Sequence, residues 1–599
     1  MNKRFFTLHK SRIVLSILFL LLCPSLLQAK ETWTRLRTQN FTIIGNASER
    51  DMRKVALQLE EFRYTISLLL PKAKITTNIP TVVVLFKSHD SFKPFKPLYK
   101  GKVQENVGGY FQRTADINYI ALTAETRGLN PLEVIFHEYE HFVIDNNLNR
   151  APLWFNEGMA EFYSTFEPAD DGSKFHLGTP IARHIVELRQ GTLLPLDKLL
   201  NVSHKSPEYN ERGKVGMFYA ESWALIHYLM LGEEGKRRPQ LSQFIANLNG
   251  NLSVEENFRQ SFQTDYQTME KELRQYIGRF TFPAITYIFK KQLDYAKDAN
   301  VTALSEAEVN AQLGDLLMRT GRAEEAGKRL QQAIALDDHC APAYLSLGEL
   351  RLRERKLPEA KPLIEKALAL DADNYQAHYL YGTILDEENQ IESAMNEYRK
   401  AAALKSDIAK PHVALAYDLV RLKREDEAMA SFQKAVQLDP RDPNIRRARS
   451  YIYLRLGRGF SAAMDATTYL RQQGWRDDHA QYMALVAVFG SRQAHRDADA
   501  TRFLNDAASK CDTAEWPYPV MRYLSGQLKE AELFSLATDN DKQTEAHAYV
   551  GLDLSLKGNT EAALNHLKWV KENGNKNFVE YALALAEIER LESSATVKQ

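Results

Sequence analysis

The spacing of apolar residues predicts short strands and helices in the first half of the chain. Residues 41–44 and 81–86 are apolar runs of strand length, and the second is typical of a buried strand. Between them, Val55 and Leu59 recur at helical spacing, on a helix that is predicted to begin at Ser48. This part of the chain therefore mixes both kinds of element.

A hairpin and then a mostly helical stretch complete the first half. Residues 109–112 and 118–122 are rich in aromatic and apolar side chains, and they flank a short turn at 114–116. From there to about residue 289 the pattern is mainly helical. Strands that come first and helices that follow them favour an α+β domain.

From about residue 305, small residues return at a fixed interval of 34 residues. Small side chains let the two helices of a hairpin approach closely, and each hairpin then buries its open face on the next one. The recurring positions are Gly314, Gly348, Gly382 and Ala416, followed twelve residues later by Ala326, Ala360, Ala394 and Ala428. This segment resembles the tetratricopeptide repeat (TPR) family, which implies an all-α solenoid.

These patterns divide the chain into five segments. Residues 1–29 are a predicted signal peptide, 30–290 the α+β domain and 291–306 a linker or helix. Residues 307–476 hold four clear repeats and one degenerate repeat, and 477–599 form a C-terminal helical region with a divergent TPR-like unit.

The start of the chain has the pattern of an export signal. Lys3 and Arg4 give it a positive charge, residues 13–22 are apolar, and Ala29 is a small residue suited to cleavage. The apolar run is shorter than the roughly 20 residues of a membrane-spanning helix. We therefore expect a mature chain without a transmembrane segment in a periplasmic or extracellular compartment. An anchor that is left uncleaved is the alternative.

Charge and cysteine content exclude several classes of protein. Lys and Arg (77) balance Asp and Glu (77), so the chain lacks the basic surplus of a nucleic-acid-binding protein. After cleavage only Cys340 and Cys511 remain, far apart in the sequence. Two such cysteines make neither a disulfide scaffold nor a spaced metal site.

The candidate chemistry begins at His137 and His141. They are four residues apart, so on a helix both imidazoles lie on one face and can reach one metal ion. Glu138 follows the first histidine, where its carboxylate can accept a proton from an attacking water. Two surface histidines on a solvated helix are the alternative interpretation.

A second acidic pair follows in residues 154–162, where Glu157 and Glu161 are also four apart. The histidine pair followed by Trp-x-x-Glu-Gly-x-Ala-Glu resembles the peptidase MA-like (gluzincin-type) zinc metallopeptidases. The resemblance implies a zincin-like α+β domain in which His137, His141 and Glu157 bind Zn²⁺ and Glu138 is the general base. It also implies that Glu161 accepts a hydrogen bond from a ligating histidine. An acidic helix face is the alternative for the two glutamates.

Relatives of this kind often place a tyrosine or histidine donor on a later helix, where it stabilises the oxyanion. Tyr219 is the candidate here and His227 a weaker one, and packing within a helix face is the alternative role of Tyr219. The hairpin at 108–122 occupies the position of the substrate-binding edge strand of similar enzymes.

The sequence thus predicts an exported zinc metallopeptidase that hydrolyses peptide bonds, with a TPR platform whose groove binds a protein partner. Three alternatives stay open. The first is a catalytically inactive TPR interaction or scaffold protein, and the second is a zinc amidase that acts on cell-wall peptides. In the third, the repeats are only a rigid spacer.

Overall fold

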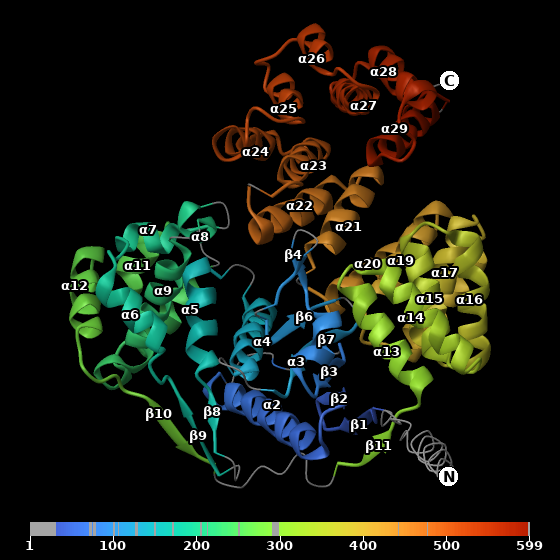
Figure 1. Ribbon diagram of the computed structural model, residues 1–599. Coiled ribbons are helices and arrows are strands. Elements are labelled where there is room, and N and C mark those ends of the chain that lie inside the picture. Colours follow the sequence, from blue (N-terminus) through green and yellow to red (C-terminus); the bar gives the residue numbers. More distant parts are fainter. Residues whose placement is uncertain are drawn as a thin grey trace, which may run out of the picture.

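The computed structural model describes residues 31–596, apart from 71–74, 76–78, 100–101, 106, 115, 126–129, 149–150, 170–172, 204–205, 212–213, 249–251, 290–298, 441 and 476. The predicted signal peptide and the first half of the predicted linker at 291–306 lie outside the described residues. Among the helices that are described, none combines the length and the apolar character needed to span a bilayer. The described chain is mostly helical, with a smaller share of strands (Figure 1).

A six-stranded sheet lies at the centre of the N-terminal part (Figure 1). Its neighbouring strands β2, β3 and β7 are parallel, whereas β6 lies at the edge and pairs, among the described strands, only with β7, in antiparallel fashion. The predicted hairpin is therefore present. In spatial order the strands are β11 (Val301–Ala303), β1 (Thr34–Arg37), β2 (Phe41–Gly45), β3 (Thr81–Phe86), β7 (Asn118–Thr123) and β6 (Gly109–Gln112).

Helices α2 (Glu49–Leu69) and α4 (Pro131–Asn147) cover one face of this sheet. Val83 and Ile120 point into that layer, where they join one apolar core with Phe62 and Phe136. Short elements connect the strands beyond β3: α3 (His89–Phe92), η1 (Lys93–Phe95), β4 (Leu98–Tyr99) and β5 (Lys102–Val103).

A mainly helical lobe packs beside α4 and shares its apolar core. Its central helices α5 and α9 contact each other closely. Its helices are α5 (Leu153–Ser164), α6 (Ala182–Gln190), α7 (Leu196–Asn201), α8 (Pro207–Asn210), α9 (Val215–Leu231), η2 (Gly232–Gly235), α10 (Arg238–Asn247), α11 (Val254–Phe262) and α12 (Tyr266–Ile277). A small sheet of β8 (Glu167–Pro168), β9 (Lys174–Leu177) and β10 (Ile285–Ile288) closes the lobe.

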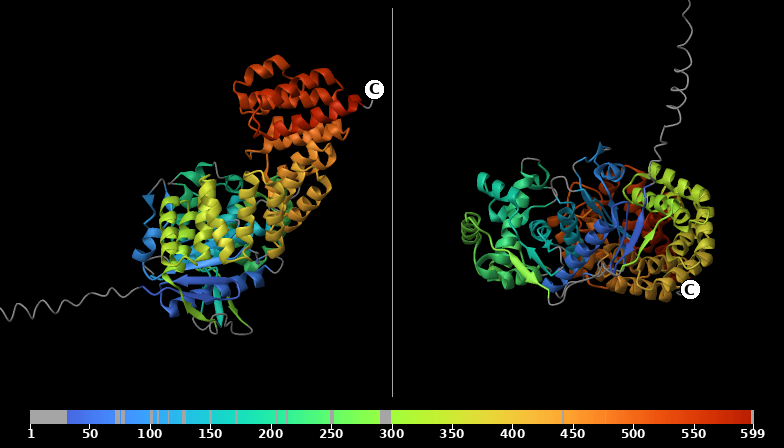
Figure 2. Two further views of the ribbon diagram at one scale, coloured as in Figure 1. Left: turned by 90° about the vertical axis from the view of Figure 1, so that its right-hand side faces the viewer. Right: turned by 60° about the horizontal axis from the view of Figure 1, so that its bottom comes forward.

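The repeat region is a stack of helical hairpins, which confirms the predicted TPR-like solenoid (Figure 2). The first five hairpins are α13 (Glu306–Arg319) with α14 (Ala323–Leu336), α15 (Ala341–Arg353) with α16 (Leu357–Leu370), α17 (Tyr375–Glu387) with α18 (Ile391–Leu404), α19 (Lys410–Arg421) with α20 (Glu425–Leu438), and α21 (Pro443–Arg455) with α22 (Gly459–Gln473). Gly314 and its equivalents lie where the paired helix crosses, since a Cβ at Gly314 would meet Leu330 at 2.7 Å.

The segment after α22, predicted to be helical with a divergent TPR-like unit, continues as helical hairpins. In Figure 2 these C-terminal helices stand apart from the body of the molecule. They are α23 (Ala480–Gln493), α24 (Asp497–Lys510), α25 (Tyr518–Leu524), α26 (Glu530–Leu536), α27 (Asn540–Leu556), α28 (Thr560–Asn573) and α29 (Val579–Thr596).

The second face of the central sheet is covered by the first repeats. Val82 and Tyr119 on this face share an apolar core with Leu313 and Leu316 of α13. Side chains alternate between the two faces along a strand, and both faces of β3 are covered. All six residues of β3 are therefore buried, which explains its continuous apolar run. Residues 301–303, inside the segment expected to be a linker or helix, form β11 and pair with β1.

Candidate metal centre

Two consecutive helices carry the candidate ligands. Helix α4 begins at an Asn130 cap, whose side chain accepts a hydrogen bond from the Leu132 amide, with Pro131 in the first turn. Helix α5 packs against α4 on one side and α9 on the other. Gly158 makes the approach of α9 possible, since a Cβ there would lie 2.5 Å from the Ser222 carbonyl oxygen.

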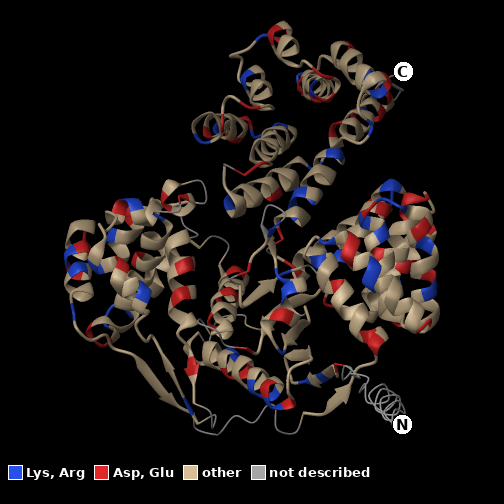
Figure 3. Cartoon of the chain, viewed as in Figure 1, with Lys and Arg blue, Asp and Glu red and all other residues tan. Residues whose placement is uncertain are grey.

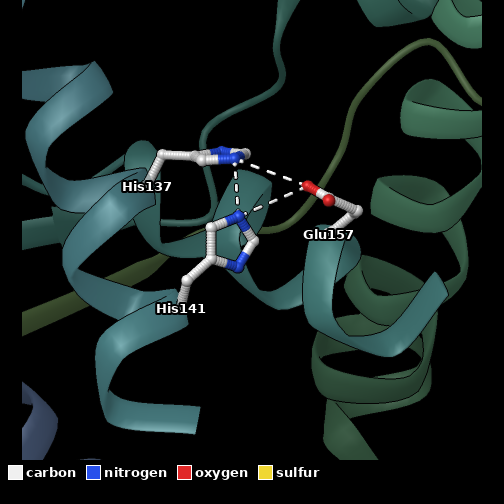
Figure 4. A group of neighbouring side chains, drawn as sticks. All are labelled: His137, His141 and Glu157. Carbon is white, nitrogen blue, oxygen red and sulfur yellow. Dashed lines mark hydrogen bonds and ion pairs between the residues drawn. The ribbon is translucent and has the colours of Figure 1, made fainter. Parts of the chain in front are cut away.

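The structure brings His137, His141 and Glu157 together (Figure 4). The Nε2 atoms of the two imidazoles are 3.1 Å apart, and Glu157 Oε2 lies 3.5 Å from His137 Nε2 and 3.4 Å from His141 Nε2. Ligand atoms about 2.0–2.2 Å from a tetrahedral zinc ion are themselves separated by about 3.3–3.6 Å. The three side chains therefore form a triangle of the size that one such ion requires.

Neighbouring groups decide which nitrogen of each imidazole carries the proton. His141 Nδ1 lies 3.0 Å from Asn156 Oδ1, a carbonyl oxygen that can only accept, so Nδ1 donates. In the neutral ring, the form that binds a metal, Nε2 then carries the lone pair. His137 Nδ1 faces Glu161 Oε1 at 3.7 Å, which favours the same tautomer. Both lone pairs then point toward Glu157.

Glu161 lies beside the site, but its hydrogen bonds differ from those predicted. The 3.7 Å separation from His137 exceeds hydrogen-bond length. The Glu161 carboxylate instead accepts hydrogen bonds from His184 Nε2 at 3.0 Å and from Arg183 Nη2 at 3.1 Å. Burial opposes its ionisation, but these partners and the charge of His137 lower the pKa of Glu161. It is a buried anion behind the first histidine.

The electrostatics of the triangle favour a carboxylate at Glu157. Burial would raise the pKa of Glu157, but the two histidines outweigh it and lower the value to about 2. Burial likewise lowers the pKa of His141, whereas Glu157 and Asn156 raise it to about 9. The negative charge in this largely buried site thus attracts positive charge to the point where the imidazoles meet.

Glu138 and two tyrosines surround the triangle. Glu138 is half-buried on α4, and its charge acts on both His141 and Tyr209. The Tyr219 ring stacks on His137 with 6.5 Å between centroids and on Tyr209 with 6.3 Å. Tyr209 donates a 3.4 Å hydrogen bond to Glu157 Oε1. Burial and the Glu157 charge raise the pKa of both tyrosines, so each hydroxyl keeps its proton.

His227, the weaker candidate donor, is not available. It is fully buried, and its two ring nitrogens lie 2.7 Å from the Tyr276 hydroxyl and 2.7 Å from the Gly178 carbonyl oxygen. Since both nitrogens have partners away from the triangle, His227 holds α9 to its neighbours.

Sequence reasoning missed four residues of this site: Asn156, Arg183, His184 and Tyr209. Asn156 directly precedes Glu157 and could have been noticed as a polar residue within an apolar helix start. The other three lie on α6 and α8, with no spacing that relates them to the histidine pair. Only the packing of the helical lobe brings them to the site.

Comparisons with known proteins found similarity mainly in the repeat region. The family described as the tetratricopeptide repeat protein 21 C-terminal ARM domain matches residues 255–448, which is less than half of the chain. No curated protein matches the sequence.

Several solved structures are similar over about a third of this chain. One is the subject of a functional characterisation of Pseudomonas aeruginosa pilF, with 18% identity, 37% of this chain and 98% of that chain covered, and a TM-score of 0.32. YrrB, described as a TPR protein with an unusual peptide-binding site, has 20% identity, coverage of 33% and 98%, and a TM-score of 0.28. PilW, described as a type IV pilus biogenesis factor, has 15% identity, coverage of 35% and 94%, and a TM-score of 0.31. The helical hairpins that begin at α13 and the family match at residues 255–448 both indicate TPR-like helical repeats.

Proposed function

We propose that this chain is an exported zinc-dependent metallopeptidase that carries a TPR-type interaction platform. One observation carries the proposal. Two imidazole nitrogens and a carboxylate oxygen from adjacent helices converge at 3.1–3.5 Å, with a further glutamate next to the first histidine.

The donor set fits a zinc ion. Among the described residues Glu157 Oε2 is buried without a hydrogen-bond partner, and in the neutral rings the two Nε2 lone pairs lie on the same side. Three such acceptors in contact repel one another unless a cation or a proton lies between them. Nitrogen and carboxylate ligands in a three-residue set are typical of catalytic zinc, which keeps its fourth position open.

A zinc ion bound here would supply Lewis acidity, which acidifies water and polarises a carbonyl group. The Glu138 carboxylate would accept the proton of the attacking water and return it to the leaving amine. Tyr219, whose ring stacks on His137, would donate its hydroxyl proton to the developing oxyanion, while Tyr209 donates to the Glu157 carboxylate. The free edge of β6 could pair with an extended peptide.

The test uses the purified full chain and its Glu138→Gln variant. Both should carry about one zinc ion per chain by elemental analysis, and only the wild type should cleave a broad peptide library, with a loss of several orders of magnitude in the variant. His141→Ala should lose the metal. Absence of stoichiometric zinc from the wild type would refute the metal site. Equal cleavage by both proteins would refute Glu138 as the base.

A second candidate is an interaction scaffold without catalytic activity. The comparisons favour it over the peptidase, since the family match covers much of the repeat region and starts only at residue 255, beyond the metal centre. The same measurement separates the two, because a scaffold binds a protein partner yet leaves every peptide intact. Cleavage restricted to cell-wall peptides would point instead to the zinc amidase.

A further inference from the structure

The tip of the β6–β7 hairpin lies against the repeats. Asp116, in the turn between the two strands, is only 9% exposed. Its Oδ2 atom lies 3.3 Å from Lys410 Nζ on α19 and 4.0 Å from Arg319 Nη1 on α13. One carboxylate at the end of the predicted substrate strand is therefore held by cations from the first and the fourth repeat.

A buried network extends this contact along the repeats. Arg319 makes a bidentate ion pair with Glu349 of α15, at 2.9 and 2.7 Å. Asp315 of α13 accepts a 2.6 Å hydrogen bond from the Tyr119 hydroxyl of β7 and another from Ser346 at 3.1 Å. Both the tip of the hairpin and its second strand are thus bonded to repeat side chains.

The repeat side chains involved come from equivalent positions. Asp315 and Glu349 are 34 residues apart, as are Gln376 and Lys410, and Gln376 donates a 2.9 Å hydrogen bond to Glu349. All four lie on the first helix of a repeat, on the side that faces the hairpin. We call this side the inner face, defined by Asp315, Arg319, Glu349, Gln376 and Lys410. Repeat proteins use such a continuous face to bind partners.

The hairpin has one other polar anchor near its tip. Arg113 pairs with Asp145 on α4, and its guanidinium lies 5.2 Å from the centre of the Phe142 ring. Because β6 is an edge strand of the described sheet, its position depends on β7, on packing against α4, on the hydrogen bond from Tyr110 to the Phe95 carbonyl oxygen and on these two anchors. Arg113 ties the hairpin to α4, the helix with the histidines, and Asp116 ties it to the repeats.

We propose that the inner face of the repeats binds the β6–β7 hairpin of the same chain, and that Asp116 is the positioning residue through which the repeats fix the edge strand. The repeats thereby act on peptide binding without touching the metal centre. The effect on catalysis rests on the proposed function, whereas the docking of the hairpin does not.

The experiment compares the full chain with Asp116→Asn, which keeps the shape of the side chain and removes its charge. Backbone amides of Gly109–Gln112 should exchange hydrogen about tenfold faster in the variant. Zinc content should stay the same and the thermal unfolding midpoint should fall only slightly. KM for a cleaved peptide should rise about tenfold with kcat within about twofold. Lys410→Met should reproduce these changes and add little to Asp116→Asn in the double variant.

Glu324→Gln is the matched control, since Glu324 is an exposed acid of the same repeats that pairs only with Lys328 among the described residues. It should leave exchange in β6 unchanged. Wild-type exchange of β6 in Asp116→Asn would overturn the proposal, and so would faster exchange spread evenly over α9 and the repeats. Faster exchange confined to the hairpin in a chain that binds no zinc would uphold the docking and reject the peptidase.

Discussion

At the scale of single residues, the candidate metal centre depends on side chains other than the proposed ligands. Asn156 is the clearest case, because its carbonyl oxygen fixes the proton of His141 on Nδ1. Glu161 plays the corresponding role for His137 at longer range, while His184 and Arg183 hold it in place. His141 is thus oriented by a hydrogen-bonded partner, as is usual for metal-binding histidines, whereas His137 faces the Glu161 carboxylate beyond hydrogen-bond length.

Replacing Asn156 by alanine should weaken zinc binding without changing the ligands. The His141 ring loses the acceptor that orients it, and losses of about 10- to 100-fold in metal affinity are typical of such changes. Competition with a zinc chelator of known affinity measures the effect. An affinity equal to that of the wild type would show that Asn156 does not orient the ring.

Glu221 on α9 predicts a pH dependence of stability. Burial raises its pKa to about 8, against an ordinary value of 4.5, although the Leu194 amide donates to it at 2.8 Å. The folded state therefore holds a proton that the unfolded state releases between these two values. The contribution of Glu221 to the free energy of unfolding is fully present below about pH 4.5. It is lost as the pH rises toward 8, at up to about 1.4 kcal/mol per pH unit.

Glu221→Gln should remove this contribution, since an amide keeps the hydrogen-bond acceptor and cannot ionise. Denaturant unfolding at pH 5, 6, 7 and 8 should show a flatter dependence for the variant than for the wild type. Parallel curves for the two proteins would mean that Glu221 ionises in the folded state as it does in the unfolded chain.

At the scale of elements, the site depends on how closely α5 approaches α9. A Cβ at Gly158 would come within 2.5 Å of the Ser222 carbonyl oxygen and 2.6 Å of Ile226 Cγ1. Backbone atoms cannot move aside as the end of a flexible side chain can. The glycine is therefore required by packing, and not by its φ angle.

Gly158→Ala should lower the stability of the protein by about 1–3 kcal/mol, the usual cost of overpacking. Gly327→Ala is the matched control, because a Cβ there meets only Leu350 Cδ2, at an ordinary 3.5 Å. Because Gly327 lies inside a helix, its replacement by alanine should raise the stability of the protein by up to about 1 kcal/mol. Chemical denaturation of both variants gives the comparison, and equal effects would contradict the packing argument.

At the scale of the whole molecule, the first repeat belongs to the core of the N-terminal part. Leu313 and Leu316 of α13 pack on the sheet face opposite α2, and β11 extends the sheet just before α13 begins. Over the repeat helices, Lys and Arg are interspersed with Asp and Glu (Figure 3). Contact between the two parts rests on apolar burial, on the bonds at the inner face and on further bonds such as the ion pair of Arg35 with Glu308.

A chain that ends at residue 289 should fail to fold into the structure it has here. Without α13 it exposes the apolar face of the sheet that includes Val82, Val84 and Phe86. We expect binding of a hydrophobic dye and rapid proteolysis where the full chain shows neither. Leu316→Ala in the full chain should cost about 2–5 kcal/mol. A well-folded fragment with a cooperative thermal transition would show that the repeats are dispensable for the sheet.

The sequence by itself determined the features that depend on short-range spacing. The 34-residue period specifies the repeats because each hairpin contacts only its neighbours, and the four-residue interval puts His137 and His141 on one helix face. The apolar run of β3 already indicated burial on both faces. It did not indicate what would bury the second one.

Only the tertiary structure decided which distant segments meet. Tyr209 reaches Glu157 across 52 residues, and Tyr119 reaches Asp315 across 196. Such contacts leave no periodic trace in the sequence, because they depend on how whole helices pack and not on the local backbone. For the same reason, the sequence indicated two adjoining domains. In the structure, helices of the N-terminal part cover one face of the central sheet and the first repeat covers the other.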